Sequence, residues 1–307
     1  MNASGGVRGR TADLVRRHPL AAFLAWAFTV GQAIAFLPVV LRAVYGVDVA
    51  THLFVVLANL IGLLLPALVI TWIVDGPDGV RALWSSALRA RAGWRWYLLA
   101  LVGVPLATAA ITLLLLGPPA RAGSLLGPAL VAGLLVQSVL VFLTSNWWEE
   151  IAWAGFLQSR LQDRAGPVRA ALLTGPLFAL QHVSLAVGNT LAGAVAVLVF
   201  ITAMAIPFRF LQGWVLNGTG SLFVVGLVHA AGNASTDGSG VAGTGFLPRL
   251  YPGQNVGPVH LVASAALGLV VLAATRGRLG RPRKDVVAPA SPRRKEPSRQ
   301  HAGSRGR

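Results

Sequence analysis

The sequence lacks cysteine and has few charged residues. None of its 307 residues is cysteine, and only 12% are charged, whereas soluble domains carry roughly 25%. Without cysteine, the chain cannot form disulfides or zinc–thiolate sites. So little charge excludes a conventional water-soluble enzyme. The high hydrophobic content of 55% and the mean hydropathy of +0.66 indicate instead that much of the chain lies in lipid.

Apolar windows of the length needed to cross a bilayer, about 20 residues, recur along the chain. They predict an all-α fold: a polytopic transmembrane helical bundle with about eight spans. The expected spans are 20–41, 53–74, 96–116, 125–146, 170–187, 190–207, 214–232 and 258–274.

The positions of the basic residues predict the orientation of these spans. With eight spans and the N-terminus inside, 23 of the 26 basic residues fall in inner segments, and only Arg42, Arg121 and Arg249 fall outside. Basic residues concentrate on the cytoplasmic side of membrane proteins. We therefore expect a multi-pass protein of the cell membrane with both termini in the cytoplasm. The first span, 20–41, is too long for the core of a cleaved signal peptide.

Three regions are expected along the chain. Residues 1–19 form a basic N-terminal segment, 20–275 a transmembrane helical domain, and 276–307 a basic tail rich in proline, serine and arginine. The tail has too few apolar residues to fold, so we predict that it is disordered. Its expected partner is anionic lipid at the membrane surface, and no nucleic acid is expected as a partner.

Ionisable residues inside an apolar region are costly to bury and usually functional. Two of the three glutamates, Glu149 and Glu150, are adjacent and follow an apolar window. Asn146 could cap a helix that begins there, with Glu149 three residues further on, since carboxylates favour the first turn. Such a cap would also fix the position of a catalytic carboxylate.

Two of the six histidines lie in otherwise apolar runs. His182 follows Phe178 by four residues, and His229 precedes Asn233 by four. Residues four apart share one face of a helix. A lone histidine in an apolar helix is more often a packing residue than a catalyst. Together with the carboxylates, however, these side chains could satisfy one another only if they met in one polar cavity.

Such a set of side chains suits hydrolysis without a serine or cysteine nucleophile. A carboxylate and an imidazole can take a proton from water, while a second imidazole and an amide stabilise an oxyanion. Alternatively, Glu149, His182 and His229 could bind a divalent metal such as zinc. The sequence has no HExxH motif and leaves both options open.

The order of these motifs resembles the CPBP intramembrane proteases, which include the CAAX prenyl endopeptidase and bacteriocin-immunity relatives and are described as metalloproteases or as glutamic-type endopeptidases. The family pattern is Glu-Glu-x-x-x-Arg, then Phe-x-x-x-His, then His-x-x-x-Asn or Asp. Here it corresponds to Glu149 with Glu150, to Phe178 with His182, and to His229 with Asn233. The motif core covers about residues 125–235.

The resemblance implies an intramembrane endopeptidase that cleaves a membrane-associated protein or peptide. Glu149 would activate the water, which His182 would share, and His229 with Asn233 would stabilise the oxyanion. Glu150 and Phe178 would support the site. The motif arginine is replaced by Ala154, so Glu150 would be unpaired or would bond to Arg160 or Arg164.

Three other functions fit the same residues. A relative without the motif arginine could be a catalytically impaired immunity or binding protein. A proton-coupled transporter would also place glutamate and histidine inside the membrane, although no repeat between the two halves is evident. A membrane scaffold that recruits partners through its basic tail would depend on residues 276–307 rather than on Glu149.

Overall fold

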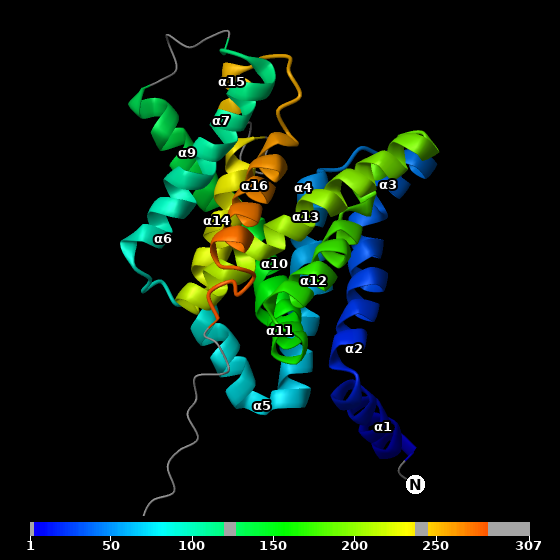
Figure 1. The fold of residues 1–307 in the computed structure, drawn as a ribbon. Helices are drawn as coiled ribbons and strands as arrows, with labels where there is room; N and C mark the ends of the chain where they lie inside the picture. Colours follow the sequence, from blue (N-terminus) through cyan, green and yellow to red (C-terminus); the bar gives the residue numbers. More distant parts are fainter. Residues whose placement is uncertain (1–2, 120–126, 237–244, 282–307) are drawn as a thin grey trace, which may run out of the picture.

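The computed structural model describes residues 3–119, 127–236 and 245–281, and these form helices joined by turns, without a strand (Figure 1). The helices are α1 (Ala3–Arg17), α2 (Pro19–Trp26), α3 (Gln32–Tyr45), α4 (Thr51–Leu57), α5 (Leu65–Ala87), α6 (Trp94–Leu98), α7 (Val104–Leu116), α9 (Pro128–Val141), α10 (Trp147–Glu150), α11 (Ser159–Ala165), α12 (Pro167–Gln181), α13 (Leu191–Thr219), α14 (Leu222–Ser235), α15 (Phe246–Leu250) and α16 (Val259–Ala274).

Several of these helices are segments of longer ones. Stretches of π-helix join α2 to α3, α4 to α5, α6 to α7, and α9 through α10 to α11 without a break in the chain direction. Five helical stretches in the described residues are long and apolar enough to cross a membrane: Pro19–Tyr45, Thr51–Ala87, Trp94–Leu116, Leu130–Ala165 and Leu191–Thr219. The predicted all-α, polytopic helical bundle is therefore confirmed.

The outer surface of the bundle is apolar, as a lipid-facing surface must be. Large hydrophobic side chains are exposed along α7, α9 and α13, including Leu114, Val131 and Val199. An exposed apolar surface of this extent marks an interaction with lipid or with another protein. Together with the long apolar helices, it supports an integral membrane protein.

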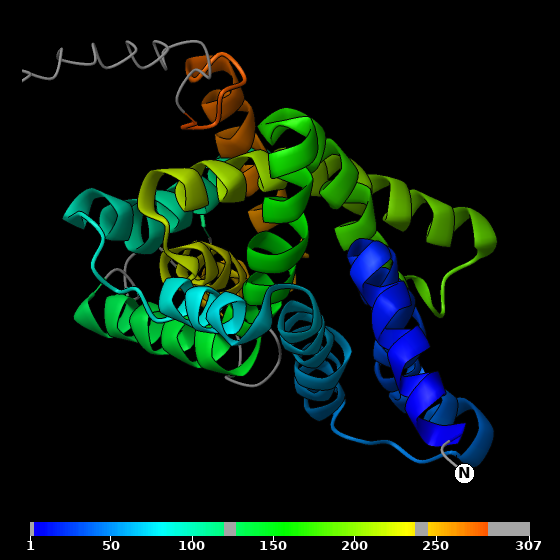
Figure 2. The ribbon, with the colours of Figure 1, turned by 90° about the horizontal axis from the view of Figure 1, so that it is seen from below.

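The molecule has two distinct ends. Helix α1, the bend of α5 and the turn from α11 to α12 lie at the lower end in Figure 1, while α15 and the start of α16 lie at the upper end. The bend of α5 is at Gly76. Gly76 has a φ of +71°, which only glycine adopts readily. Helix α13 crosses the molecule obliquely between these ends, as both Figure 1 and Figure 2 show.

Two predicted helix boundaries are wrong. The inner loop expected at 208–213 lies within the continuous helix α13, and the chain turns at Gly220 instead. No helix begins at Asn146, because Leu130–Ala165 is continuous and the Asn146 side chain caps no backbone N–H. In both places polar side chains lie inside a helix and bond to partners on other helices, Arg209 to Glu150, Gln212 to the carbonyl of Val225, and Asn146 to Asn233.

The predicted tail also begins too early. Residues 276–281 fold back onto the bundle, where Leu279 is fully buried and Arg281 forms an ion pair with Asp163. The backbone carbonyl of Leu279 accepts a hydrogen bond from Asn217. The rest of the predicted tail, 282–307, lies outside the described residues.

Candidate functional site

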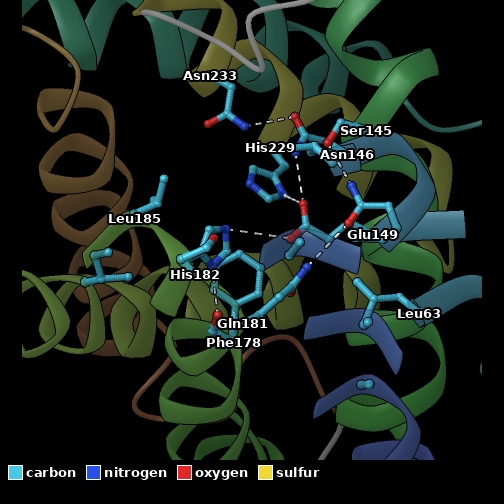
Figure 3. A pocket seen from close by; sticks show the side chains of 18 of the residues that line it. Leu63, Ser145, Asn146, Glu149, Phe178, Gln181, His182, Leu185, His229 and Asn233 are labelled. Atoms are coloured by element: carbon cyan, nitrogen blue, oxygen red, sulfur yellow. Dashed lines mark hydrogen bonds and ion pairs between the residues drawn. The ribbon is translucent and has the colours of Figure 1, made fainter. Parts of the chain in front are cut away.

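One cavity of about 400 Å³ contains the polar side chains that the sequence singled out. It lies between α3, α4, α10, the C-terminal end of α12, α13, α14 and the start of α16 (Figure 3). Glu149, Phe178, His182, His229 and Asn233 all line it. Glu150 is directly behind this surface and is fully buried. Residues from three motifs therefore meet in one place.

Glu149 is held at the cavity wall with little contact with solvent. The residue is only 4% exposed, and Asn146, one turn earlier, donates a hydrogen bond of 3.2 Å to its Oε2. Oε1 lies 4.0 Å from Nε2 of His182, and Oε2 lies 3.9 Å from Nδ1 of His229. The carboxylate thus faces both imidazoles without a direct hydrogen bond to either.

His182 has its ring orientation fixed by the backbone. It lies just after the last turn of α12, and its Nδ1 is 2.9 Å from the carbonyl oxygen of Phe178. A carbonyl can only accept, so Nδ1 carries the proton in a neutral ring and Nε2 is left as an acceptor facing Glu149. The ring also packs on Phe178, with 4.8 Å between centroids.

Glu150 is paired, but with neither of the two arginines expected. Arg209 of α13 forms a bidentate ion pair with it, with two N–O distances of 2.8 Å, and both side chains are fully buried. Arg160 instead contacts Asp75 and Thr71. The guanidinium of Arg209 also lies over the rings of Phe178 and Phe208.

The Glu150–Arg209 pair positions His229. Nδ1 of His229 lies 2.9 Å from Oε1 of Glu150. Because an ionised carboxylate only accepts, Nδ1 is the protonated nitrogen. The imidazole is also packed between Phe178 and Phe208, at centroid distances of 5.8 and 4.9 Å. This is the arrangement in which a carboxylate fixes the tautomer and direction of a histidine.

Asn233 reaches the same network through Asn146, which was expected only to cap a helix. Its Nδ2 donates a hydrogen bond of 3.1 Å to Oδ1 of Asn146, which in turn bonds to Glu149. Farther along the wall, Asn59 donates to Ser145, at 2.9 Å. Asn59 is a single amide in an apolar run. A lone polar residue in such a run could have identified Asn59 from the sequence as a residue of the site.

Arg209 was missed for a different reason. Arginine and glutamine within the run Phe208–Gly213 look like a loop between two spans when hydropathy alone is considered. No pattern in a single sequence connects a residue in α13 with Glu150, which is 59 positions earlier. Only the packing of α13 against the site identifies this partner.

The residues present do not fit a metal site well. Among the described residues, no group of three or more His, Cys, Asp and Glu is arranged to hold a metal ion. The nitrogen of His229 that faces Glu149 is already engaged with Glu150. The structure therefore gives no support to a metal ion held jointly by Glu149, His182 and His229.

The fold and the site define a class: a helical membrane protein with a glutamate and two histidines around an internal cavity. Residues 131–235, which contain all three motifs, match the family model of the Rce1-like proteins, described as type II CAAX prenyl endopeptidase Rce1-like. The family resemblance inferred from the motifs is therefore confirmed for this part of the chain. It supports a protease-type enzyme at the level of the family. The search of curated proteins gave no match.

Proposed function

We propose that the protein is an intramembrane endopeptidase of the cell membrane that hydrolyses a peptide bond of a membrane-associated protein or peptide. The observation that carries the proposal is the 4.0 Å gap between Oε1 of Glu149 and Nε2 of His182 in the cavity wall. Both atoms are acceptors, and one water can donate a hydrogen bond to each of them. A water in that position has its proton directed at a base.

In the proposed reaction, Glu149 takes a proton from this water while the water oxygen attacks the peptide carbonyl carbon. His182 keeps the water aligned through Nε2, because Nδ1 is held by the carbonyl of Phe178. The tetrahedral intermediate then collapses, the C–N bond breaks, and Glu149 returns the proton to the departing nitrogen. Water and peptide are consumed, and a carboxylic acid and an amine are formed.

The oxyanion of the intermediate needs hydrogen-bond donors. His229 would donate from Nε2, which requires that its ring carry a second proton, since Nδ1 is committed to Glu150. Asn233 would donate through the second N–H of its amide, because the first bonds to Asn146. Donors of this kind contribute roughly 10²–10³-fold to kcat in other hydrolases.

The Arg209–Glu150 pair bears on the alternative of a catalytically impaired relative. That alternative was based on the absence of an arginine at position 154. Arg209 supplies a guanidinium to the same carboxylate from another helix. The reason for expecting a loosened site is thereby removed, and an active peptidase is favoured over an immunity or binding protein.

The test is cleavage of a fatty-acylated, internally quenched fluorescent peptide library by the purified protein in lipid nanodiscs. Glu149→Gln, His182→Ala and His229→Ala are each expected to lower the rate by about 10²–10⁴-fold, the usual contribution of a general base. Circular dichroism and thermal unfolding should match those of the parent protein.

Asp163→Asn is the matched control, because Asp163 is an exposed carboxylate in a surface ion pair far from the cavity. It should cleave at the parental rate. If Glu149→Gln retained the parental rate, Glu149 would not be the base. Uptake of protons or solutes without cleavage would favour the transporter alternative.

A further inference from the structure

The cavity has its mouth at one end of the molecule. Besides the motif residues, its lining includes Thr51 at the start of α4, Ser184 and Leu185 just after α12, and His260 at the start of α16. These are helix ends on the upper side of Figure 1, and Leu185 is 62% exposed. In the opposite direction, the buried side chains of Trp153 and Phe156 fill the interior.

The basic residues gather at the other end. Arg16 donates a hydrogen bond to the carbonyl of Ile73, and Arg160 forms an ion pair with Asp75, two residues further along the same helix. Arg281 pairs with Asp163. These contacts bring α1, the lower part of α5, α11 and the residues after α16 together. The arginines on these segments and on the neighbouring turns are Arg8, Arg10, Arg16, Arg17, Arg81, Arg89, Arg91, Arg95, Arg160, Arg164, Arg169, Arg276, Arg278 and Arg281.

Few basic residues belong to the end with the mouth. Of the described residues there, Arg42 and Arg249 are basic, and Arg42 is paired with Asp48. Arg209, which falls in the inner loop expected at 208–213, is in the protein interior and does not bear on the orientation. The asymmetry between the two ends therefore persists after this correction.

Lysine and arginine are enriched in the segments that stay in the cytoplasm. We infer that the cavity opens on the non-cytoplasmic side of the membrane and that its substrate is an apolar polypeptide segment presented from that side. The part of this inference that concerns a substrate rests on the proposed function. The side of the membrane on which the cavity opens does not depend on it.

The rim of the mouth fits an apolar segment at the membrane surface. Leu185, Val187 and Leu191 follow one another around the turn from α12 to α13, and all three are exposed, Leu191 by 83%. Hydrophobic side chains on a turn at this end would contact lipid or an apolar peptide that lies against the surface. A strongly charged peptide would find no partner in these three side chains.

The absence of cysteine makes a direct test possible, because any single introduced thiol is the only one in the chain. Leu185→Cys marks the rim of the mouth, and Ala90→Cys marks an exposed position in the turn after α5, at the basic end. Each variant is treated with a membrane-impermeant maleimide in right-side-out and in inside-out membrane vesicles. The cysteine-free parent is the control for background labelling.

We expect Leu185→Cys to be labelled in right-side-out vesicles and Ala90→Cys in inside-out vesicles. The reverse pattern would overturn the inference. The fatty-acylated peptide library, added from outside, should be cleaved by right-side-out vesicles and not by inside-out vesicles. Cleavage by inside-out vesicles alone would also contradict it.

The outcomes separate this inference from the proposed function. Labelling requires no catalysis, so Glu149→Gln in the Leu185→Cys background should leave the labelling pattern unchanged. The expected labelling without cleavage in either kind of vesicle would contradict the proposed function and leave the orientation standing. Cleavage together with the reverse labelling would contradict the inferred orientation and support the proposed function.

Discussion

At the scale of single residues, the buried pair of Glu150 and Arg209 is the feature on which the geometry of the site depends. Burying a charge is costly unless it is paired and hydrogen-bonded, and here the bidentate contact compensates both charges. The remaining contact of Glu150 is with His229. The pair therefore connects the carboxylate motif on α10 with the histidine motif on α14.

Removing one member of this pair should lower the free energy of unfolding much more than removing both. Arg209→Met leaves Glu150 buried without its cation, and we expect a loss of about 3–5 kcal/mol in the free energy of unfolding. The double variant Glu150→Gln with Arg209→Met should be clearly more stable than Arg209→Met alone, because no uncompensated charge remains. Denaturant unfolding of all the variants in detergent micelles measures the coupling.

Arg160→Met is the matched control, since Arg160 was one of the two partners expected from the sequence. It removes a partly exposed ion pair with Asp75, and such pairs contribute only about 0–1 kcal/mol. A similar loss in Arg160→Met and Arg209→Met would contradict the assignment of Arg209. So would strict additivity of the changes at Glu150 and Arg209.

The packing around position 154 explains why the arginine that pairs with Glu150 is on α13 and not at position 154. Ala154 is fully buried in the apolar core, and the adjacent Gly155 would bring a Cβ within 2.6 Å of Leu222. The helix is therefore packed too closely here for a long side chain. Ala154→Arg, which the sequence alone would suggest as a harmless restoration of the motif, is expected to overpack the core instead.

At the scale of helices, the site depends on how closely α13 approaches α16. Gly268 of α16 faces Pro207 of α13, and a Cβ on Gly268 would lie 1.8 Å from the Pro207 carbonyl oxygen. Small residues at such crossings let membrane helices come together. Pro207 directly precedes Phe208 and Arg209, so this crossing holds the segment that carries the cation of the site.

Gly268→Ala should therefore force α13 and α16 apart, lowering both the melting temperature and the rate of cleavage. Gly133→Ala, in the middle of α9, is the matched control because its new Cβ would have only one neighbour within 4 Å, at 3.9 Å. Alanine there removes the cost of a helical glycine, about 1 kcal/mol. Equal melting temperatures for the two variants would show that the crossing can relax freely.

Helix boundaries mark the point where prediction from hydropathy fails. The apolar windows predicted the helical bundle, and the spacing of Phe178 with His182 and of His229 with Asn233 predicted which side chains line the cavity. The loop at 208–213 was predicted from polar residues that are in fact buried. Hydropathy cannot distinguish a polar side chain in water from one satisfied by a distant helix, because that partner is set by packing.

At the scale of the whole molecule, the two ends of the bundle have different compositions and different tasks. The basic end is tied together by ion pairs and backbone contacts, as between Arg281 and Asp163. The other end contains the mouth of the cavity and few basic residues. The sequence predicted that most basic residues lie on one side of the membrane, but their position at the end opposite the mouth required the structure.

Truncation of the C-terminal segment tests which of its residues belong to the folded bundle. Truncation after Arg281 removes the basic residues beyond it, and truncation after Thr275 also removes Leu279. Burial of a leucine side chain stabilises by about 1.5–3 kcal/mol, and the bond from Asn217 to the Leu279 carbonyl would be lost as well. The shorter protein should therefore melt at a lower temperature, whereas the longer one should melt like the parent and cleave at the parental rate.

If truncation after Arg281 abolished function while Glu149→Gln did not, the protein would act as a scaffold through its tail, because the cavity would then be dispensable.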